Sequence, residues 1–325
     1  MKYVFGPVTS RRLGKSLGID PVPLKTCNWN CVYCQLGRTR PLTNVRREYV
    51  PCQEIIAEVQ QVLAVHQAGA IDWVTFVGSG EPTLHSRLGW LIRQVKDMTT
   101  LPVAVITNGA LLYLLEVRQQ LTAADAVLPT LDAGSPRLYR KINRPWPVPT
   151  FERMIDGFVS FRKEFMGKLW VEVMLVNGLN DTQEALMDIA TVVQSIQPDR
   201  VHINLPMRPP AEAWVQPPDR EGVLRAIAIL GENAGVVPPA QGRFDFSGHE
   251  SINEAIVAIL TRHPMHEEEL IAALEDWAPG EAHRILDRLR AGGQVQVVER
   301  SGKRFWSVAA ARYADSLSPF ERRGA

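Results

Sequence analysis

The hydrophobic positions of this chain alternate between short unbroken apolar runs and longer stretches with helical spacing. Trp73 to Val77 is one apolar run, too short for a helix, and the stretch 52–66 before it repeats its apolar residues every three or four positions. The same alternation recurs along the chain. It predicts strands at 16–24, 72–77, 102–106, 126–128, 169–176 and 201–205, with helices at 52–66, 84–98, 151–165 and 182–195.

Continuous apolar strands separated by helices are typical of a parallel sheet that is covered on both faces. Six such units are too few to close an eight-stranded barrel. An open, partial (β/α)6 barrel of the α/β class fits the pattern, and it is expected over residues 1–245. The proline-rich stretch 206–218 is predicted to be a loop over one mouth of this barrel.

The pattern changes after a predicted linker at 236–250. Three helical stretches follow, and then two strands are joined by a turn at 301–303. Three helices and a hairpin describe a winged helix-turn-helix domain over residues 250–310, and the tail 311–325 is expected to be loose. The predicted helices are 252–260, 267–274 and 280–289, and the strands are 294–298 and 304–308.

Composition restricts the function classes only weakly. A chain of 325 residues with 46% apolar residues has the size of roughly two domains and enough apolar surface for a core. The net charge is +1, but residues 1–50 hold nine Lys or Arg and two Asp or Glu, so they carry +7 and the remainder carries 1 − 7 = −6. Such a bias usually marks a solvated face; a nearby anionic ligand or nucleic-acid backbone is the alternative.

No segment reaches the ~20 apolar residues that a membrane-spanning helix needs. Residues 1–7 also lack the apolar run of a signal peptide. We therefore expect a cytoplasmic protein without membrane contact.

Three of the four cysteines, Cys27, Cys31 and Cys34, lie within eight residues at C-x3-C-x2-C spacing. In a reducing compartment this clustering favours a metal centre over disulfides. A structural zinc site needs four closed ligands and would have to recruit Cys52 or a distant histidine. An iron–sulfur cubane on three thiolates leaves one iron open for a substrate or cofactor. Cys52 is most simply a helix-start residue without a metal role.

The cysteine loop resembles the signature of the radical S-adenosylmethionine (SAM) superfamily, C-x3-C-x-aromatic-C. With the runs Ser10-Arg11-Arg12-Leu13-Gly14, Leu17-Gly18-Ile19-Asp20 and Lys25-Thr26-Cys27, the likeness is to the wyosine-synthase-like branch of "Fe–S oxidoreductases". It covers residues 1–245 and implies the same partial barrel. It also implies a [4Fe–4S] cluster on the three cysteines, SAM on the open iron, and Tyr33 near the adenine.

Unusual residues follow the predicted strands, at the end where ligands gather in parallel α/β proteins. Gly78-Ser79-Gly80-Glu81-Pro82 resembles the family's GGEP element, with Ser79 in place of its second glycine. The resemblance implies that this element receives the methionine ammonium group of SAM, through backbone carbonyls and Glu81.

Other polar residues each have a functional and a structural interpretation, and two of them, Asn108 and Asp132, are expected on the same rim. Asn108 and Asp132 are candidates for hydrogen bonds to the SAM ribose, or simple turn residues. Arg144 is a candidate for the methionine carboxylate, or part of a surface salt bridge. Glu172, inside a predicted strand, needs a partner if it faces the barrel interior. His263 and His266 are interpreted as part of a solvated helix start rather than as metal ligands.

The resemblance implies a radical SAM enzyme that takes an electron from an external flavodoxin- or ferredoxin-type donor and cleaves SAM to a 5′-deoxyadenosyl radical, which abstracts hydrogen. A tRNA guanosine is the implied substrate, although a second C-x2-C cluster is absent from the sequence; a peptide or protein is the alternative. A zinc-stabilised DNA-binding regulator is a third hypothesis, but an α/β domain of this size does not need a zinc ion for its stability.

The mixed charge of 250–310 predicts substrate presentation rather than DNA reading. Deleting 250–325 is expected to leave cluster assembly intact.

Overall fold

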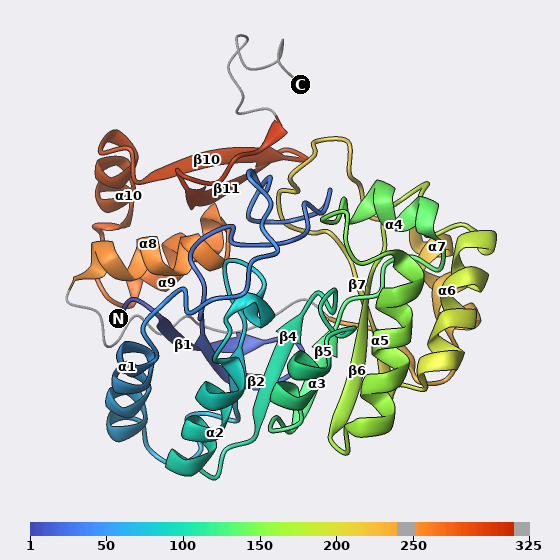
Figure 1. The fold of residues 1–325 in the computed structure, drawn as a ribbon. Coiled ribbons are helices and arrows are strands. Elements are labelled where there is room, and N and C mark those ends of the chain that lie inside the picture. Colours follow the sequence, from blue (N-terminus) through green and yellow to red (C-terminus); the bar gives the residue numbers. More distant parts are fainter. Residues whose placement is uncertain (239–250, 315–325) are drawn as a thin grey trace.

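The computed structural model describes residues 1–238 and 251–314. The larger part is a sheet with its strands in the order β1 to β8 (Figure 1). β1 (Val4–Ser10) pairs antiparallel with β2 (Gly14–Ile19), and all later neighbours are parallel. The later strands are β3 (Trp73–Phe76), β4 (Val103–Thr107), β5 (Ala126–Pro129), β6 (Lys168–Met174), β7 (Arg200–Asn204) and β8 (Ala234–Val236).

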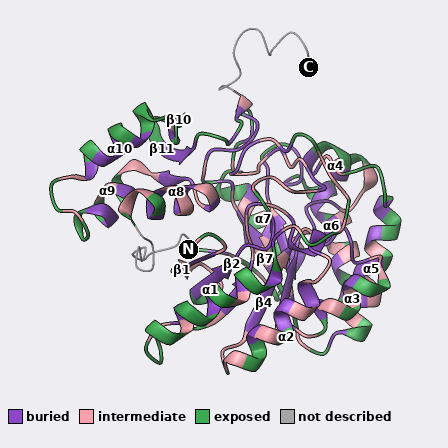
Figure 2. Ribbon diagram, turned by 60° about the vertical axis from the view of Figure 1, so that its left-hand side comes forward, coloured by how far each residue is buried: buried purple, intermediate pink, exposed green. Residues whose placement is uncertain are grey.

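Helices connect the parallel strands and lie on the outer face of the sheet, which is buried beneath them (Figures 1 and 2). Three of them begin at a side-chain cap: Thr150 and Thr182 through their hydroxyl groups, and Asp219 through its carboxylate. The helices are α1 (Cys52–Val65), the 3-10 turn η1 (Pro82–Leu84), α2 (Leu88–Met98), α3 (Leu115–Leu121), α4 (Pro136–Ile142), α5 (Phe151–Glu164), α6 (Gln183–Ile196) and α7 (Arg220–Leu230).

The predicted α/β class and the six parallel strands are confirmed, but the edges of the sheet are not as predicted. β1 was missed because Gly6-Pro7 interrupts its apolar pattern, and the register shifts between Phe5 and Val8. β8 was missed because it has three residues. The predicted strand 16–24 ends at Ile19, before Pro21 and Pro23, and the predicted helix 84–98 begins only at Leu88.

Residues 251–308 form a second unit with its own apolar core. Its strands lie in the antiparallel order β10-β11-β9, and Ser251 caps α8 by accepting the N–H of Glu254. The two-residue strand β9 was not predicted. The elements are α8 (Ile252–Arg262), β9 (Met265–His266), α9 (Glu267–Glu275), α10 (Ala282–Ala291), β10 (Val295–Arg300) and β11 (Lys303–Val308).

The predicted linker and tail fall largely outside the described residues, which exclude 239–250 and 315–325. Within the segment predicted to be loose, however, Ala311 and Tyr313 are buried. Across the described parts of the chain, no helix combines the length and apolar character needed to cross a membrane.

The second unit and the segment after it dock on the barrel next to the cysteine loop. The Tyr313 hydroxyl donates to the carbonyl of Gln35 over 2.6 Å, and the N–H of Arg38 donates to the carbonyl of Arg312 over 2.7 Å. Arg300 donates to the carbonyl of Arg208, in the loop after β7. The loop that follows Cys34 is therefore held by residues nearly 300 positions away.

Candidate active site

The three clustered cysteines lie in the loop between β2 and α1, at the carboxyl end of the parallel strands. Each sulfur has an N–H donor beside it. Lys25 Nζ lies 3.1 Å from Cys34 Sγ, the N–H of Trp29 lies 3.4 Å from Cys27 Sγ, and Asn143 Nδ2 lies 3.7 Å from Cys31 Sγ. Such donors stabilise thiolates that bind metal.

A single metal ion and an iron–sulfur cluster need different arrangements of these thiols. Within residues 1–238 and 251–314, no three His, Cys, Asp or Glu side chains converge as one metal ion would require. A zinc ion needs its ligands around one point, whereas a cubane takes each thiolate on a different iron. Cys52 lies buried at the start of α1. The donor set therefore fits a three-cysteine cubane.

Without metal, burial favours the thiol form of Cys27 and Cys31. It raises the pKa of Cys27 to about 12 and that of Cys31 well above its ordinary value. Binding of a cluster must therefore displace protons, as is general for thiolate sites.

The Gly78–Glu81 loop follows β3 and lies against the cysteine loop. A Cβ atom at Gly78 would overlap the carboxylate of Asp20, and one at Gly80 would overlap the carbonyl of Thr26. Both glycines therefore allow neighbouring parts of the chain to approach this loop more closely than a side chain would permit. The Ser79 side chain is directed at Asp20, to which its hydroxyl donates over 2.6 Å, so the serine is accommodated by a specific partner.

The carboxylate of Glu81 is almost fully engaged within the protein. Oε1 accepts from the N–H and hydroxyl of Thr83 and from the hydroxyl of Thr107, while Oε2 accepts from the N–H of Asn108. A carboxylate has about four acceptor positions in total. Glu81 therefore anchors the loop to η1 and to the end of β4, and little of its capacity to accept hydrogen bonds is left for a ligand.

Asn108 joins the end of β4 to the cysteine loop. Its Nδ2 donates to Asn28 Oδ1 over 2.6 Å and lies 3.8 Å from Cys27 Sγ. Its Oδ1 accepts the N–H of Ala110, which is the predicted turn chemistry.

Asp132 fixes the aromatic residue of the cysteine motif. Its carboxylate accepts from the Tyr33 hydroxyl over 2.5 Å, from Asn143 Nδ2 over 2.6 Å and from the N–H of Met174 over 2.7 Å. Burial raises the pKa of Asp132 to about 6 and that of Tyr33 well above its usual range. The structure thus brings Tyr33 and Asp132 together, and the Asp132 carboxylate accepts three hydrogen bonds from the protein.

Arg144 has the structural partner that was predicted as its alternative. Its guanidinium pairs with Glu212 over 2.5 Å, and Arg38 pairs with the same carboxylate over 2.8 Å. Glu212 is buried and forms an ion-pair triad with Arg38 and Arg144. The guanidinium of Arg144 is therefore already paired with a carboxylate of the protein.

Two further sequence expectations concern residues near the barrel interior. Glu172 has the partner that it needs, since Arg12 forms an ion pair with it. His263 is not part of a solvated helix start: both ring nitrogens are buried, and the ring packs edge-on against Phe5. Its apolar neighbour lies far back in the sequence, in β1, so local spacing could not predict this.

Sequence reasoning missed several residues of the site: Asp20, Lys25, Asn28, Asn143 and Glu212. Lys25 and Asn28 flank Cys27, and a polar residue next to a metal ligand is a usable signal. Asp20, Asn143 and Glu212 act through partners that are distant in sequence, so no local pattern marks them.

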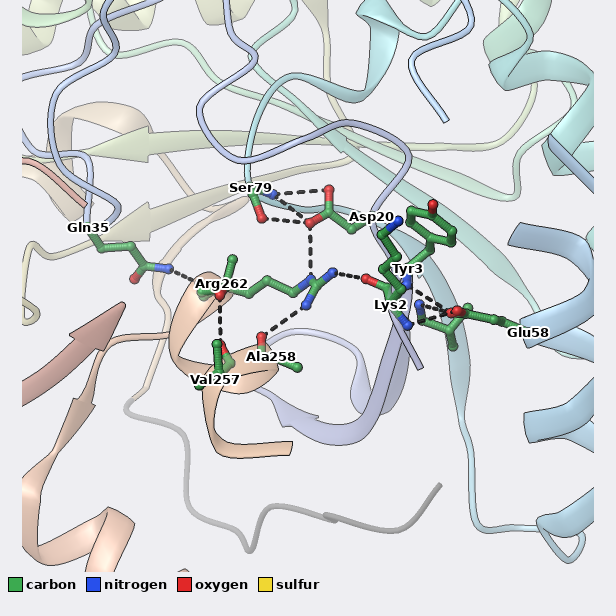
Figure 3. Close-up of polar contacts among 11 residues, drawn as sticks. Lys2, Tyr3, Asp20, Gln35, Glu58, Ser79, Val257, Ala258 and Arg262 are labelled. Carbon is green, nitrogen blue, oxygen red and sulfur yellow. Dashed lines mark hydrogen bonds and ion pairs between the residues drawn. The ribbon is translucent and has the colours of Figure 1, made fainter. Parts of the chain in front are cut away.

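Arg262, at the end of α8, connects the second unit to the Gly78–Glu81 loop (Figure 3). Its Nε donates to Asp20 Oδ2 over 3.0 Å, and its Nη2 donates to the carbonyl of Lys2 over 2.8 Å. The same Asp20 oxygen accepts the Ser79 hydroxyl, and the carbonyl of Arg262 accepts Gln35 Nε2. One buried ion pair thus links the second unit to both loops of the site.

Replacing Arg262 with Ala is expected to leave Asp20 as a buried carboxylate without its counter-ion. The side chains of this pair are 8% and 3% exposed, so the free energy of unfolding should fall by about 3–5 kcal/mol. Urea denaturation measures this change. Arg304→Gln is the matched control, because the Arg304 ion pair with Glu267 is partly exposed and worth about 0–1 kcal/mol. Equal losses in both variants would contradict the importance of the buried pair.

Three thiols in one loop, next to a glycine-rich loop at the carboxyl end of an open parallel barrel, define an iron–sulfur protein with an open coordination position. A family model described as "Radical SAM superfamily" matches residues 22–190. The UPF0026 protein MJ1312 of Methanocaldococcus jannaschii is 34% identical over 310 residues, which cover 94% of this chain and 96% of that protein. This chain belongs to the radical SAM superfamily and, within it, to the UPF0026 family.

Two other similarities differ in how much of each protein they cover. The protein named GTPase Obg of Brachyspira hyodysenteriae is 37% identical over 300 residues, which cover 91% of this chain but 43% of that protein. This chain therefore spans less than half of that relative. A structure of TYW1 with a lysine–pyruvate adduct bound matches at 13% identity and a TM-score of 0.45, covering 93% of this chain and 83% of that one.

Membership of the superfamily shows that this chain is a radical SAM enzyme, with a [4Fe–4S] cluster and SAM as its cofactors.

Proposed function

We propose that Cys27, Cys31 and Cys34 hold the [4Fe–4S] cluster, and that the enzyme uses it to abstract hydrogen from a nucleoside of tRNA. The observation that carries the cluster assignment is the donor set: three thiols in one loop, each beside an N–H group. When bound and reduced, the cluster supplies the electron that cleaves SAM to methionine and a 5′-deoxyadenosyl radical. A flavodoxin- or ferredoxin-type donor would provide that electron.

The chain's own residues would position SAM beside the cluster. The backbone of the Gly78–Gly80 loop approaches closely because neither glycine has a side chain, which suits it to receive the methionine ammonium group. Tyr33, held by Asp132, presents a fixed aromatic ring next to two cysteines and is proposed to contact the adenine. Asn108 and Asp132 remain candidates for the ribose, although each already has protein partners.

Glu81 and Arg144 take indirect roles in this proposal. Glu81 fixes the loop that meets SAM, through its four hydrogen bonds within the protein. Arg144 fixes Glu212, whose N–H donates to the carbonyl of Val32 in the cysteine loop. Both residues would preorganise the site rather than contact the cofactor.

We propose that the second unit is a winged helix-turn-helix type domain, with α9 and α10 as its two characteristic helices, and that it presents the substrate. One basic residue of this unit, Arg300, is already used for docking, since it donates to carbonyls of the barrel at Arg208 and Val215. Arg288, Arg290 and Lys303 are exposed and available to a polyanion.

Glu81→Ala is expected to weaken SAM binding, because the N–H groups of Thr83 and Asn108 would be left without their acceptor and the loop would lose its anchor. Each unsatisfied buried donor costs about 1–3 kcal/mol. SAM affinity, measured by equilibrium binding to the reconstituted enzyme, should therefore fall by at least about tenfold. Glu221→Ala is the control, since that carboxylate is exposed and pairs with Arg225 within α7. Unchanged SAM affinity in Glu81→Ala would contradict the anchoring role.

The substrate assignment is tested by supplying the reduced enzyme with SAM and either total tRNA or a peptide mixture. A tRNA substrate should accelerate 5′-deoxyadenosine formation over the slow uncoupled rate, and the modified nucleoside should appear after RNA digestion. Acceleration by peptides alone would assign the enzyme to peptide modification.

A further inference from the structure

The pair Arg11-Arg12, at the turn between β1 and β2, has no role in the site described above. The Ser10 hydroxyl accepts the N–H groups of Arg12 and Leu13 over 3.4 and 3.3 Å, which fixes this turn. Arg12 reaches across to β6, where it pairs with Glu172. The turn therefore brings the guanidinium of Arg12 to β6, and burial together with the charge of the neighbouring Arg11 lowers the pKa of Arg12 to about 9.

Two more cationic or titratable groups lie in the same region: Arg208, in the loop after β7, and His263, after α8. Burial, together with the charges of Arg208, Arg262, Arg11 and Arg12, lowers the pKa of His263 to about 3, so its imidazole is neutral near pH 7. Burial and the charge of Arg11 likewise lower the pKa of Arg208 to about 10. The cationic cluster, defined as Arg11, Arg12, Arg208 and His263, thus collects groups from both edges of the sheet and from the second unit.

The charges of this cluster are not balanced. Arg12 has Glu172, and the neighbouring Arg262 has Asp20. Among the described residues, neither Arg11 nor Arg208 forms an ion pair; Arg208 donates to the amide oxygen of Gln35, and the acid that acts on it, Glu269, is exposed. Partly buried guanidinium groups without counter-ions are unfavourable unless a ligand provides the charge.

Polar atoms around the cluster also lack partners. Within the described parts of the chain, Arg12 Nε, His202 Nδ1, Asn204 Oδ1 and both ring nitrogens of His263 are buried without a hydrogen bond. Asn204 itself is 3% exposed, at the end of β7. Buried polar groups nearly always have a partner, so their concentration here independently indicates a place for a polar ligand.

The cluster lies beside the reaction centre. Arg208 Nη1 donates to Gln35 Oε1 over 3.0 Å, and Gln35 directly follows Cys34. If Arg208 binds the charged group of a ligand, the rest of that ligand would therefore lie close to the proposed [4Fe–4S] cluster.

We propose that Arg11, Arg12 and Arg208, with His202, Asn204 and His263 around them, form a binding site for a phosphate group of the substrate. A phosphate monoester carries close to two negative charges at neutral pH, which matches the two guanidinium groups without counter-ions. Its oxygens suit the forked donors of arginine. This inference rests on the proposed function, and it adds the chemical class of the substrate. A sugar phosphate, a nucleotide and an RNA backbone share this chemistry.

The test measures ligand binding to the full-length, cluster-loaded protein by calorimetry with the SAM site saturated. Inorganic phosphate and ribose 5-phosphate should bind, whereas ribose and acetate should not. Arg11→Gln and Arg208→Gln should each weaken phosphate binding by at least about tenfold, since each removes a charge-assisted hydrogen bond. Arg11→Lys should retain part of the affinity, and Arg304→Gln should match the wild type.

A short RNA without terminal phosphates identifies the source of the phosphate: tighter binding than ribose 5-phosphate assigns the site to an RNA backbone, and weaker binding assigns it to a small phosphate ester. The proposal is overturned if the wild type does not bind phosphate, if acetate binds equally well, or if Arg11→Gln and Arg208→Gln bind phosphate normally. Iron content and 5′-deoxyadenosine formation are measured on the same samples. Normal SAM cleavage without phosphate binding would refute this site alone, whereas absent SAM cleavage would refute the proposed function.

Discussion

Deleting residues 250–325 is expected to abolish assembly of a stable cluster, contrary to the expectation from the sequence. The loop after Cys34 would lose the hydrogen bonds that Tyr313, Arg312 and Arg262 make to it. Asp20, which positions Ser79, would also lose its counter-ion. Each lost hydrogen bond is worth about 1 kcal/mol and the buried ion pair more, so the loop should no longer hold the thiols in place.

Iron and sulfide content after anaerobic reconstitution measures this effect directly. A deletion of residues 315–325 alone is the control, because it keeps every contact named above and should retain a full cluster. If the 1–249 fragment binds as much iron as the whole chain, the second unit is a separate substrate-binding module, and its contacts with the loop are incidental.

Replacing any one of Cys27, Cys31 or Cys34 with Ala is expected to remove the cluster. A cubane with three protein ligands has no spare thiolate nearby, because Cys52 lies buried at the start of α1, where its backbone N–H donates to Glu48. The wild type should contain about four irons per chain with the broad visible absorption of a cubane, and each variant should lose most of both.

Cys52→Ala supplies the control for these variants. It removes a buried sulfur from the core and should cost some stability, but it should leave the iron content unchanged. Loss of iron in Cys52→Ala alone would mean that this cysteine completes a four-thiolate site, and the three-cysteine centre would be wrong.

The sequence predicts the parts of this molecule that depend on local patterns. Six parallel strands follow from apolar runs, and the cysteine loop follows from its spacing. β1 escaped notice because Gly6-Pro7 disrupts an otherwise apolar strand, although the strand remains paired with β2 on both sides of the irregularity. The low β-strand propensity of Gly and Pro is overridden here by pairing with a neighbouring strand.

Long-range side-chain pairs could not be predicted from the sequence. Tyr33 and Asp132 are 99 positions apart, and Asp20 and Arg262 are 242 positions apart. Asn108, Asp132 and Arg144 were recognised as rim residues because they follow strands or turns. Their partners in the protein changed the interpretation of each, since a carboxylate or guanidinium that is already paired serves a ligand less directly.

The most direct test of the central claim is to reduce the anaerobically reconstituted enzyme in the presence of SAM and to quantify the products. We expect 5′-deoxyadenosine and methionine in equal amounts, with neither formed by Cys27→Ala, Cys31→Ala or Cys34→Ala. Formation of 5′-methylthioadenosine instead, or undiminished 5′-deoxyadenosine in a cysteine variant, would contradict reductive SAM cleavage at a cluster held by this loop.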